Sequence, residues 1–314
     1  DRRIVMFEQD LQQEVSVIET IIKKYMPDTG SYQKTVIDAM NYTMSAGGKR
    51  IRPLLMKKVY ELFGGTKEYI EPFMAAIEMI HTYSLIHDDL PALDNDDYRR
   101  GRKTAHVVYG EAMAILAGDS LLNYAYETAM KGFDFITHTK DVSREELETE
   151  LQERIRLERA MTVLAKNPGI GGMIGGQVAD VELTGTVLNG EQLHYIYENK
   201  TGALIEAAIL IGAILAGADD EKIALMKDVA YNIGMAFQIQ DDILDEVATF
   251  EELGKPVHSD EKNKKITYVT IHGLEDSQKE VEHLSKEAIE ILQSIEGNSA
   301  FLEELTEFLI HRNK

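Results

Sequence analysis

The amino-acid sequence predicts an all-α fold in a single domain over residues 1–314, and three observations point to it. Alternating runs of Val, Ile, Thr and Tyr bounded by hairpin dipeptides are scarce, which indicates few strands. Apolar residues recur instead at spacings of three and four, the period of an amphipathic helix. Composition does not shift between the halves and no long flexible linker is evident, so one domain is favoured, although the length alone would also allow two.

The first strongly helical segment is EPFMAAIEMIHTYSLIH, residues 71–87. Phe73, Ile77 and Ile80 recur at spacings of four and three, as expected for a largely buried helix. Pro91 should stop or kink this helix, because proline disfavours the helical conformation of the residue before it.

A second helix is expected over residues 143–165. It begins with Ser143 and Glu146 at the spacing of a capping box. Charged residues four positions apart follow on its outer face, and its apolar stripe is formed by Leu147, Leu151 and Ile155. We interpret it as a solvated surface helix and assign it no function.

The longest apolar run is AAILIGAILAGA, residues 207–218. It has about half of the ~20 residues that a membrane-spanning helix needs, so it predicts a buried helix. The formal charge of −21 argues against nucleic acid as a partner and against stable membrane association. The chain has no cysteine and opens on charged residues, so we expect a cytoplasmic protein without disulfides or a secretory signal. It lacks an initiator Met, which indicates either trimming or a sequence cut at its start.

An acidic cluster, HDDLPALDNDD, follows the helix over residues 71–87. Asp88 and Asp89 should end that helix, and Asp94 would have to return toward them through the break at Pro91. Taken alone, such a cluster is as often a solvated charge run as a metal site.

A second acidic cluster, FQIQDDILDE, lies far along the chain and contains Asp241, Asp242 and Asp245. On a helix, Asp241 and Asp245 lie about 40° apart on one face. Two such clusters on apolar helices are hard to explain without a compensating ion, because buried unpaired carboxylates are costly. Hard oxygen ligands of this kind suit Mg²⁺, which takes further ligands from water and phosphate.

Basic residues complement these clusters. The segment GGKRIRP supplies Lys49, Arg50 and Arg52, and it is not a P-loop because Arg50 follows the lysine in place of Ser or Thr. The remaining candidates flank the acidic clusters and are Arg99, Arg100, Lys200, Thr201, Lys255 and Lys265. Together these residues could hold two polyanions, one through metal and one directly.

His81 lies seven residues before Asp88, so both project from nearly the same face of the predicted helix. A lone histidine on an apolar helix is usually a core residue, but this alignment favours a ligand-binding role. Tyr83 and Ser84 lie about one turn below Asp88 and should line the space along the helix.

In combination, the motifs resemble the trans-type isoprenyl diphosphate synthases of the polyprenyl synthetase family. The resemblance runs through GGKRIRP, EMIHTYSLIHDDLPALDNDDYRRG, GMIGGQVAD, KTGALI, FQIQDDILD and GKPVHSDEKNKKITYV, in that order. It implies mostly antiparallel helices around a deep central cavity, a homodimer, and Mg²⁺-dependent joining of isopentenyl diphosphate to an allylic diphosphate.

The resemblance also implies roles for individual residues. Those matching the Mg²⁺-binding and catalytic aspartates are Asp88, Asp89, Asp94, Asp241, Asp242 and Asp245, with Lys200 as a further catalytic group. Those matching the isopentenyl diphosphate site are Lys49, Arg52, His81 and Arg100. Those matching the allylic diphosphate site are Arg99, Lys200, Thr201, Gln238, Lys255 and Lys265. Asp96 and Asp97 are expected to orient or balance the two arginines that follow them. One departure from the family pattern is His258, where many relatives have glycine.

Tyr83 and Ser84 carry the expectation for product length. An aromatic residue there should close the cavity early, and bacterial-type farnesyl diphosphate synthases resemble the chain at these positions. We therefore expect a C15 product, with C20 geranylgeranyl diphosphate as the alternative.

Three rival functions can be separated from this one. A terpene cyclase would carry an Asn, Ser and Glu pattern in its second motif, which QIQDDILD lacks. A non-catalytic subunit of a heteromeric synthase typically loses an aspartate motif or a basic ligand, and here both sets are intact. A plain acidic scaffold would give the matched basic positions no purpose.

Overall fold

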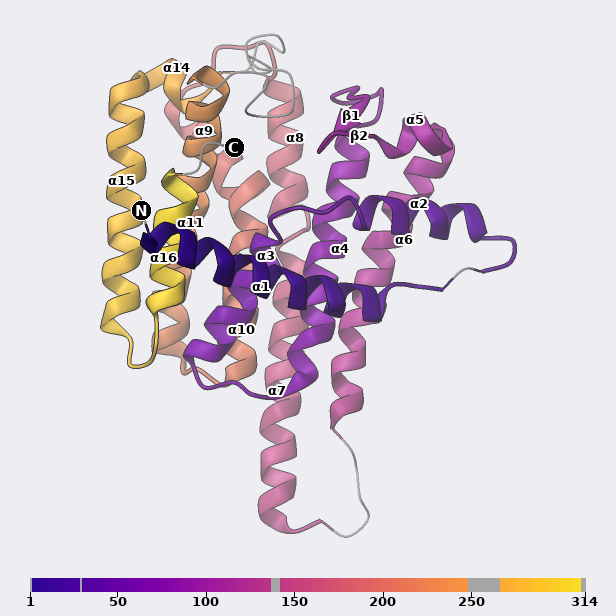
Figure 1. Ribbon diagram of the computed structural model, residues 1–314, viewed down its shortest axis with the longest axis vertical. Helices are drawn as coiled ribbons and strands as arrows, with labels where there is room; N and C mark the ends of the chain where they lie inside the picture. Colours follow the sequence, from indigo (N-terminus) through magenta and orange to yellow (C-terminus); the bar gives the residue numbers. More distant parts are fainter. Residues whose placement is uncertain (1, 29, 137–141, 248–265, 312–314) are drawn as a thin grey trace. The chain divides into compact units, whose positions relative to one another are not determined.

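The computed structural model describes residues 2–28, 30–136, 142–247 and 266–311, and these ranges are almost entirely helical (Figure 1). The all-α prediction is confirmed. The chain divides into two compact units, Asp1–Lys57 with Thr66–Met161 and Lys58–Gly65 with Thr162–Lys314. The single-domain arrangement around a central cavity stays a prediction.

The elements that begin in unit 1 are α1 (Arg2–Tyr25), α2 (Lys34–Met44), α3 (Ile51–Leu62), the 3₁₀ turn η1 (Glu68–Ile70), α4 (Glu71–Asp88), α5 (Ala105–Tyr109), α6 (Glu111–Met130), the 3₁₀ turn η2 (Lys131–Phe135) and α7 (Arg144–Lys166). Helices α3 and α7 continue past the boundary into unit 2. Helix α4 is the centre of unit 1 and packs most extensively against α6. Most of its residues are buried, from Pro72 to Ile86. The buried helix expected over residues 71–87 is therefore confirmed.

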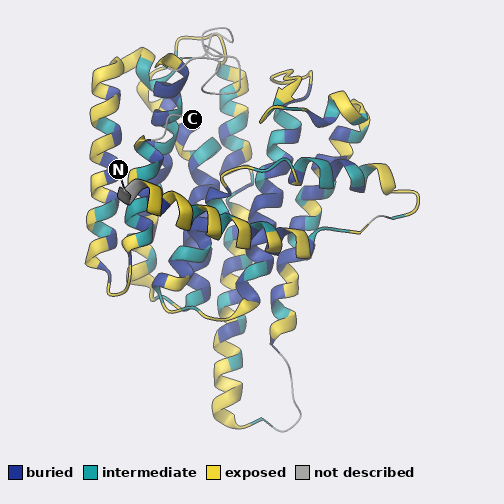
Figure 2. Cartoon of the chain, in the orientation of Figure 1, coloured by how far each residue is buried: buried dark blue, intermediate teal, exposed yellow. Residues whose placement is uncertain are grey.

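The capping box expected at the start of α7 is also confirmed. The Ser143 N–H donates to Glu146 Oε2 (2.6 Å) and the Glu146 N–H donates to Ser143 Oγ (3.2 Å). The first turns of α7 are exposed on nearly every side (Figure 2), and even its apolar stripe, Leu147, Leu151 and Ile155, is exposed.

A short hairpin was missed by the sequence. Strands β1 (Tyr98–Arg99) and β2 (Arg102–Lys103) pair in antiparallel register, with Tyr98 opposite Lys103. The two turn residues, Arg100 and Gly101, both have positive φ (53° and 73°), which is typical of a type I′ hairpin turn. The usual Asn-Gly or Asp-Gly signal is absent there, so the sequence pattern did not predict a hairpin.

The elements of unit 2 are α8 (Met173–Leu183), α9 (Gly190–Ile196), the π-helical turn η3 (Tyr197–Thr201), α10 (Gly202–Ala216), α11 (Asp220–Val247), α14 (Tyr268–His272), α15 (Leu274–Ser294) and α16 (Ala300–His311). Helix α10 is buried along almost its whole length, as residues 207–218 predicted. Within the described ranges, one helical run, Gly190–Ala216, is apolar and long enough to span a membrane. Because 67% of its most apolar window is buried, it has the signature of a core helix.

Candidate active site

The first acidic cluster lies where α4 ends, at Asp88. Beyond the turn around Pro91, the Asp94 N–H donates to the Asp88 carbonyl oxygen (2.9 Å) and the Asp96 N–H donates to that of Asp89 (3.2 Å). The chain therefore folds back onto the helix end, and the expected return of Asp94 toward Asp88 is confirmed for the backbone. Asp88 is half-buried and Asp94 is exposed.

The Asp89 carboxylate forms an ion pair with Arg99. Its buried carboxylate accepts hydrogen bonds from Arg99 Nε (2.9 and 3.0 Å) and Arg99 Nη2 (2.7 Å). Burial raises the pKa of Asp89, and the Arg99 guanidinium opposes that shift. The pair ties the β1–β2 hairpin to the end of α4. The direct partner of Arg99 is Asp89, while Asp96 acts on Arg99 through its charge, in line with the expected balancing role.

The other arginine of the hairpin reaches the GGKRIRP segment. Arg100 Nη1 donates to the Gly47 carbonyl oxygen. The guanidinium lies over the next residue, since a Cβ on Gly48 would come within 2.7 Å of Arg100 Nη1. A side chain at Gly48 would push the guanidinium aside and would be strained at the φ of 139°, and Arg100 lies beside the loop that carries Lys49 and Arg52.

His81 belongs to the same neighbourhood in unit 1. Its pKa lies well below the usual value of 6.5, mainly because burial disfavours the charged imidazolium and further because Arg52, Arg100, Arg99 and Arg50 repel it. A neutral His81 surrounded by arginines is suited to an anionic ligand, to which it can donate one hydrogen bond. The structure thus brings His81, Arg100 and the Lys49–Arg52 loop together, as the isopentenyl diphosphate set requires.

Tyr83 and Ser84 lie one turn along α4 from Asp88. The Tyr83 ring is 6% exposed and meets the His87 ring edge to face, with centroids 5.7 Å apart. Burial, with Tyr126 and Asp88 nearby, raises the pKa of Tyr83 to about 12, so its hydroxyl stays protonated. Ser84 Oγ donates to the His81 carbonyl oxygen (2.7 Å), which orients it along its own helix.

In unit 2, Lys200 lies on the π-helical turn η3. Its Nζ donates to Asp180 Oδ2 on α8 (2.6 Å). Gly176 allows this approach, because a Cβ there would lie 2.3 Å from the Lys200 backbone nitrogen. π-Helical turns often occur at functional sites, and this one offers Lys200 and the adjacent Thr201 to the same cavity.

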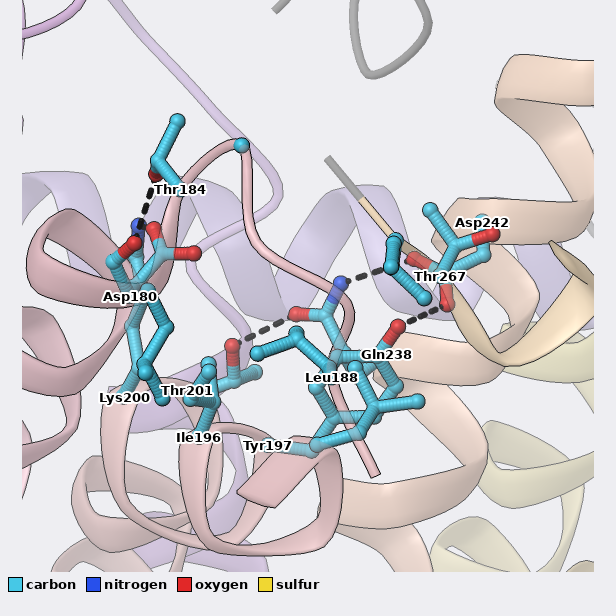
Figure 3. A pocket seen from close by; sticks show the side chains of 14 residues that line it. Asp180, Thr184, Leu188, Ile196, Tyr197, Lys200, Thr201, Gln238, Asp242 and Thr267 are labelled. Atoms are coloured by element: carbon cyan, nitrogen blue, oxygen red, sulfur yellow. Dashed lines mark hydrogen bonds and ion pairs between the residues drawn. The ribbon is translucent and has the colours of Figure 1, made fainter. Parts of the chain in front are cut away.

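A chain of hydrogen bonds links Thr201 to the second acidic cluster (Figure 3). Thr201 Oγ1 donates to Gln238 Oε1 (2.6 Å), and Gln238 Nε2 donates to Asp242 Oδ1 (3.2 Å). The other oxygen of Asp242 accepts from the Tyr197 hydroxyl and from the Tyr268 N–H (3.2 Å). Asp242 is therefore held by three donors and connects α11 with η3 and α14.

These groups line a cavity of about 90 Å³ in unit 2. Its polar wall contains Asp180, Lys200, Thr201, Gln238 and Asp242, while leucine and isoleucine side chains, with Tyr197, form the apolar wall (Figure 3). A volume of this size accommodates about three waters or one phosphate-sized group. Two residues assigned to the allylic diphosphate, Lys255 and Lys265, lie outside the described residues, as does His258.

The arrangement of carboxylates can be tested against Mg²⁺. Within the described ranges, no three His, Cys, Asp or Glu side chains converge to hold a metal ion. Mg²⁺ does not need such a cage, since one or two carboxylates suffice when water and phosphate complete its six ligands. Asp88 with Asp94, and Asp241 with Asp245 on one face of α11, are pairs of hard oxygen ligands that fit this mode.

Sequence reasoning missed the residues that hold the site residues in place. Asp180, Tyr197, Glu19 and Glu78 each contact a candidate ligand or its neighbour through a long-range pair. Two of them had a signal, since Asp180 ends the GMIGGQVAD motif and Glu78 begins the EMIHTYSLIHDDLPALDNDDYRRG motif.

Comparisons with known proteins agree on the family. The polyprenyl synthetase family model matches residues 33–305. The chain is 42% identical over 307 residues to a geranylgeranyl diphosphate synthase of Cyanophora paradoxa, which covers 96% of this chain and 95% of the relative. It is 40% identical over 306 residues to a farnesyl diphosphate synthase of Geobacillus stearothermophilus, with 98% of each chain covered. A crystal structure of a geranyltransferase from Helicobacter pylori, complexed with magnesium and isoprenyl diphosphate, superimposes with a TM-score of 0.77 at 31% identity, covering 96% of this chain and 95% of that one. On these grounds the chain belongs to the polyprenyl synthetase family.

Proposed function

We propose that the protein joins isopentenyl diphosphate head-to-tail to dimethylallyl and then geranyl diphosphate, releasing pyrophosphate and giving (2E,6E)-farnesyl diphosphate. The observation that carries this proposal is the neutral His81 among Arg52 and Arg100 beside the Lys49 loop. These groups would form a basic site that binds isopentenyl diphosphate directly. Prenyl transfer is the activity on which the family and its relatives agree.

The aspartates that we propose to hold Mg²⁺ are Asp88 and Asp94 in unit 1 and Asp241 and Asp245 in unit 2. Bound Mg²⁺ would neutralise charge on the diphosphate that departs from the allylic substrate. Asp89 and Asp242 belong to the same motifs, and their hydrogen bonds to Arg99, Tyr197 and Gln238 support a role in fixing the motifs.

The allylic diphosphate is proposed to contact Lys200, Thr201 and Gln238 of unit 2. The roles expected of Arg99, Lys255 and Lys265 stay predictions. Lys200 and Thr201 already line one cavity, and a diphosphate there would compete with Asp180 for the Lys200 ammonium. Apolar side chains beside these groups would exclude water from a reactive allylic cation. No side-chain nucleophile is needed, and the departing pyrophosphate would accept the final proton.

Product length is proposed to depend on Tyr83 and Ser84. A buried aromatic ring one turn from Asp88 supports an early floor for the growing chain. Similarity to a geranylgeranyl diphosphate synthase at 42% identity keeps the C20 product as a second candidate.

Incubation of the purified protein with isopentenyl and dimethylallyl diphosphates, with Mg²⁺ or with EDTA, tests the proposal. Mg²⁺-dependent C15 diphosphate, identified by chromatography, supports it, and C20 supports the alternative. A hydrocarbon product would identify a cyclase, and no product would favour a non-catalytic subunit.

We also propose a cytoplasmic homodimer without stable membrane association. Sedimentation without lipid vesicles tests the dimer, and sedimentation with vesicles tests the absence of membrane binding.

A further inference from the structure

The loop that carries Lys49 has a conformation that needs support. Gly47, Gly48 and Arg50 all have positive φ, at 77°, 139° and 49°. Positive φ is ordinary for glycine but disfavoured for arginine, whose Cβ crowds its own backbone. Some interaction of Arg50 must therefore favour this conformation over the alternatives.

The Arg50 side chain supplies that interaction. It is completely buried, and each of its three nitrogens donates to a different acceptor. Nε donates to Glu19 Oε1 on α1 (2.6 Å), Nη1 to Glu78 Oε1 on α4 (2.8 Å), and Nη2 to the carbonyl oxygen of Met44 at the end of α2 (2.6 Å). The guanidinium fork thus joins the loop to three helices of unit 1.

The two carboxylates differ in exposure. The Glu78 side chain is 2% exposed, whereas that of Glu19 is 38% exposed. Burial alone would lower the pKa of Arg50, but Glu78 and Glu19 reverse the effect and raise it. Arg50 is therefore a buried cation neutralised by two anions, and its guanidinium is turned into unit 1, where it bonds three acceptors.

The basic residues next to Arg50 are more accessible to a ligand than Arg50 is. Lys49 is exposed and Arg52 half-buried, and Arg100 covers Gly48 from the hairpin side. Arg50 lies between Lys49 and Arg52 in the chain. Its buried side chain therefore fixes the backbone positions from which the side chains of Lys49 and Arg52 extend.

We propose that Glu78 and Glu19 are positioning residues for the isopentenyl diphosphate site, acting through Arg50 on Lys49 and Arg52. The inference rests on the proposed function, because it assumes that Lys49 and Arg52 bind that diphosphate. Neither glutamate touches the substrate. Their effect should appear in the affinity for isopentenyl diphosphate and not in that for the allylic substrate.

Glu14 offers a matched control. It also lies on α1 and pairs with a lysine of α3, Lys57, at 2.7 Å, with both side chains about one-fifth exposed. Glu14→Gln therefore removes an α1–α3 ion pair without touching Arg50. If loss of an ion pair on α1 were enough to weaken the site, this variant would do so as well.

The test is calorimetric titration of isopentenyl diphosphate into the full chain, with KM measured separately for each substrate. For Glu78→Gln and Arg50→Lys we expect a Kd raised about ten- to hundredfold, as for a modest misplacement of binding groups. A lysine cannot reproduce the three-way fork. For Glu19→Gln, where water can reach the carboxylate, we expect about threefold. The KM of dimethylallyl diphosphate should change less than twofold throughout, and Glu14→Gln should match the wild type.

Circular dichroism identifies any variant that fails to fold. Glu19→Gln is expected to fold even if the substitutions at the buried Glu78 and Arg50 prevent folding, because the Glu19 side chain is partly exposed. Unchanged isopentenyl diphosphate affinity in folded Glu19→Gln and Glu78→Gln would overturn this inference but leave the proposed function standing. Equal weakening of both substrates, or weakening by Glu14→Gln, would also overturn it. If the wild-type chain binds no isopentenyl diphosphate, the proposed function fails first and the inference falls with it.

Discussion

The Tyr197 hydroxyl donates to the buried Asp242 carboxylate, and its removal should have a measurable cost. In Tyr197→Phe the ring keeps its place in the apolar cluster with Ile239 and Ile243. Asp242 also keeps two donors, Gln238 Nε2 (3.2 Å) and the Tyr268 N–H (3.2 Å). The variant loses the hydrogen bond to the charged Asp242 and the one that the Tyr197 hydroxyl accepts from the Tyr268 N–H (3.1 Å), which still bonds Asp242. No carboxylate is orphaned, and we expect the free energy of unfolding to fall by about 1.5–3 kcal/mol.

Urea unfolding followed by circular dichroism measures this change, and Tyr231→Phe is the matched control. Tyr231 lies on α11, the helix that carries Asp242, and its hydroxyl makes a long, exposed contact with His194 Nε2 (3.3 Å). We expect its loss to cost less than about 0.5 kcal/mol. Because Gln238 links Asp242 to Thr201, Tyr197→Phe should also raise the KM of the allylic substrate several-fold and leave that of isopentenyl diphosphate unchanged. Equal stability of the two variants would refute the reasoning.

Three further predictions concern unit 1. Tyr83→Ala should shift the products beyond C15, since it removes a buried ring near Asp88, whereas Tyr83→Phe should not; unchanged product lengths on chromatography would contradict this. Asp94→Asn should raise the Mg²⁺ concentration for half-maximal activity at least tenfold while changing stability by less than about 0.5 kcal/mol, because Asp94 is exposed. His81 has a lowered pKa, so below about pH 6.5 protons bind the unfolded chain first and stability falls by up to about 1.4 kcal/mol per pH unit. His81→Gln should flatten that part of the urea-unfolding profile, and an imidazole titrating near 6.5 by NMR would contradict the prediction.

The helices could be predicted because their signals are local. The period of Phe73, Ile77 and Ile80 defines α4, and the Ser143–Glu146 capping box defines the start of α7. Both depend on residues within one or two turns, which a single sequence displays. The β1–β2 hairpin was missed because its turn, Arg100-Gly101, is an unusual choice for two residues at positive φ.

The partners of the candidate ligands could not be predicted in the same way. Arg50 finds Glu19 and Glu78 at separations of 31 and 28 residues. Lys200 finds Asp180 at a separation of 20. Periodicity identifies the buried face of each helix but does not determine which charged residues meet when helices pack. The residue types that could bind diphosphate were therefore visible in the sequence, while the residues that orient them were not.

The paired aspartates show what such packing adds to a motif. In both Asp88-Asp89 and Asp241-Asp242 the second residue is buried and held by protein donors, Arg99 in unit 1 and Tyr197 with two others in unit 2. Adjacent residues on a helix point about 100° apart, so both members of a pair cannot face one ion equally. Asp241 lies on the face of α11 that Asp245 shares, and the Asp94 backbone returns to that of Asp88. Asp89 turns instead toward the β1–β2 hairpin and Asp242 toward α14. We therefore expect each Asp-Asp pair to combine one metal ligand with one structural anchor, so substitution of Asp89 or Asp242 should disturb the neighbouring element first and Mg²⁺ binding only through it.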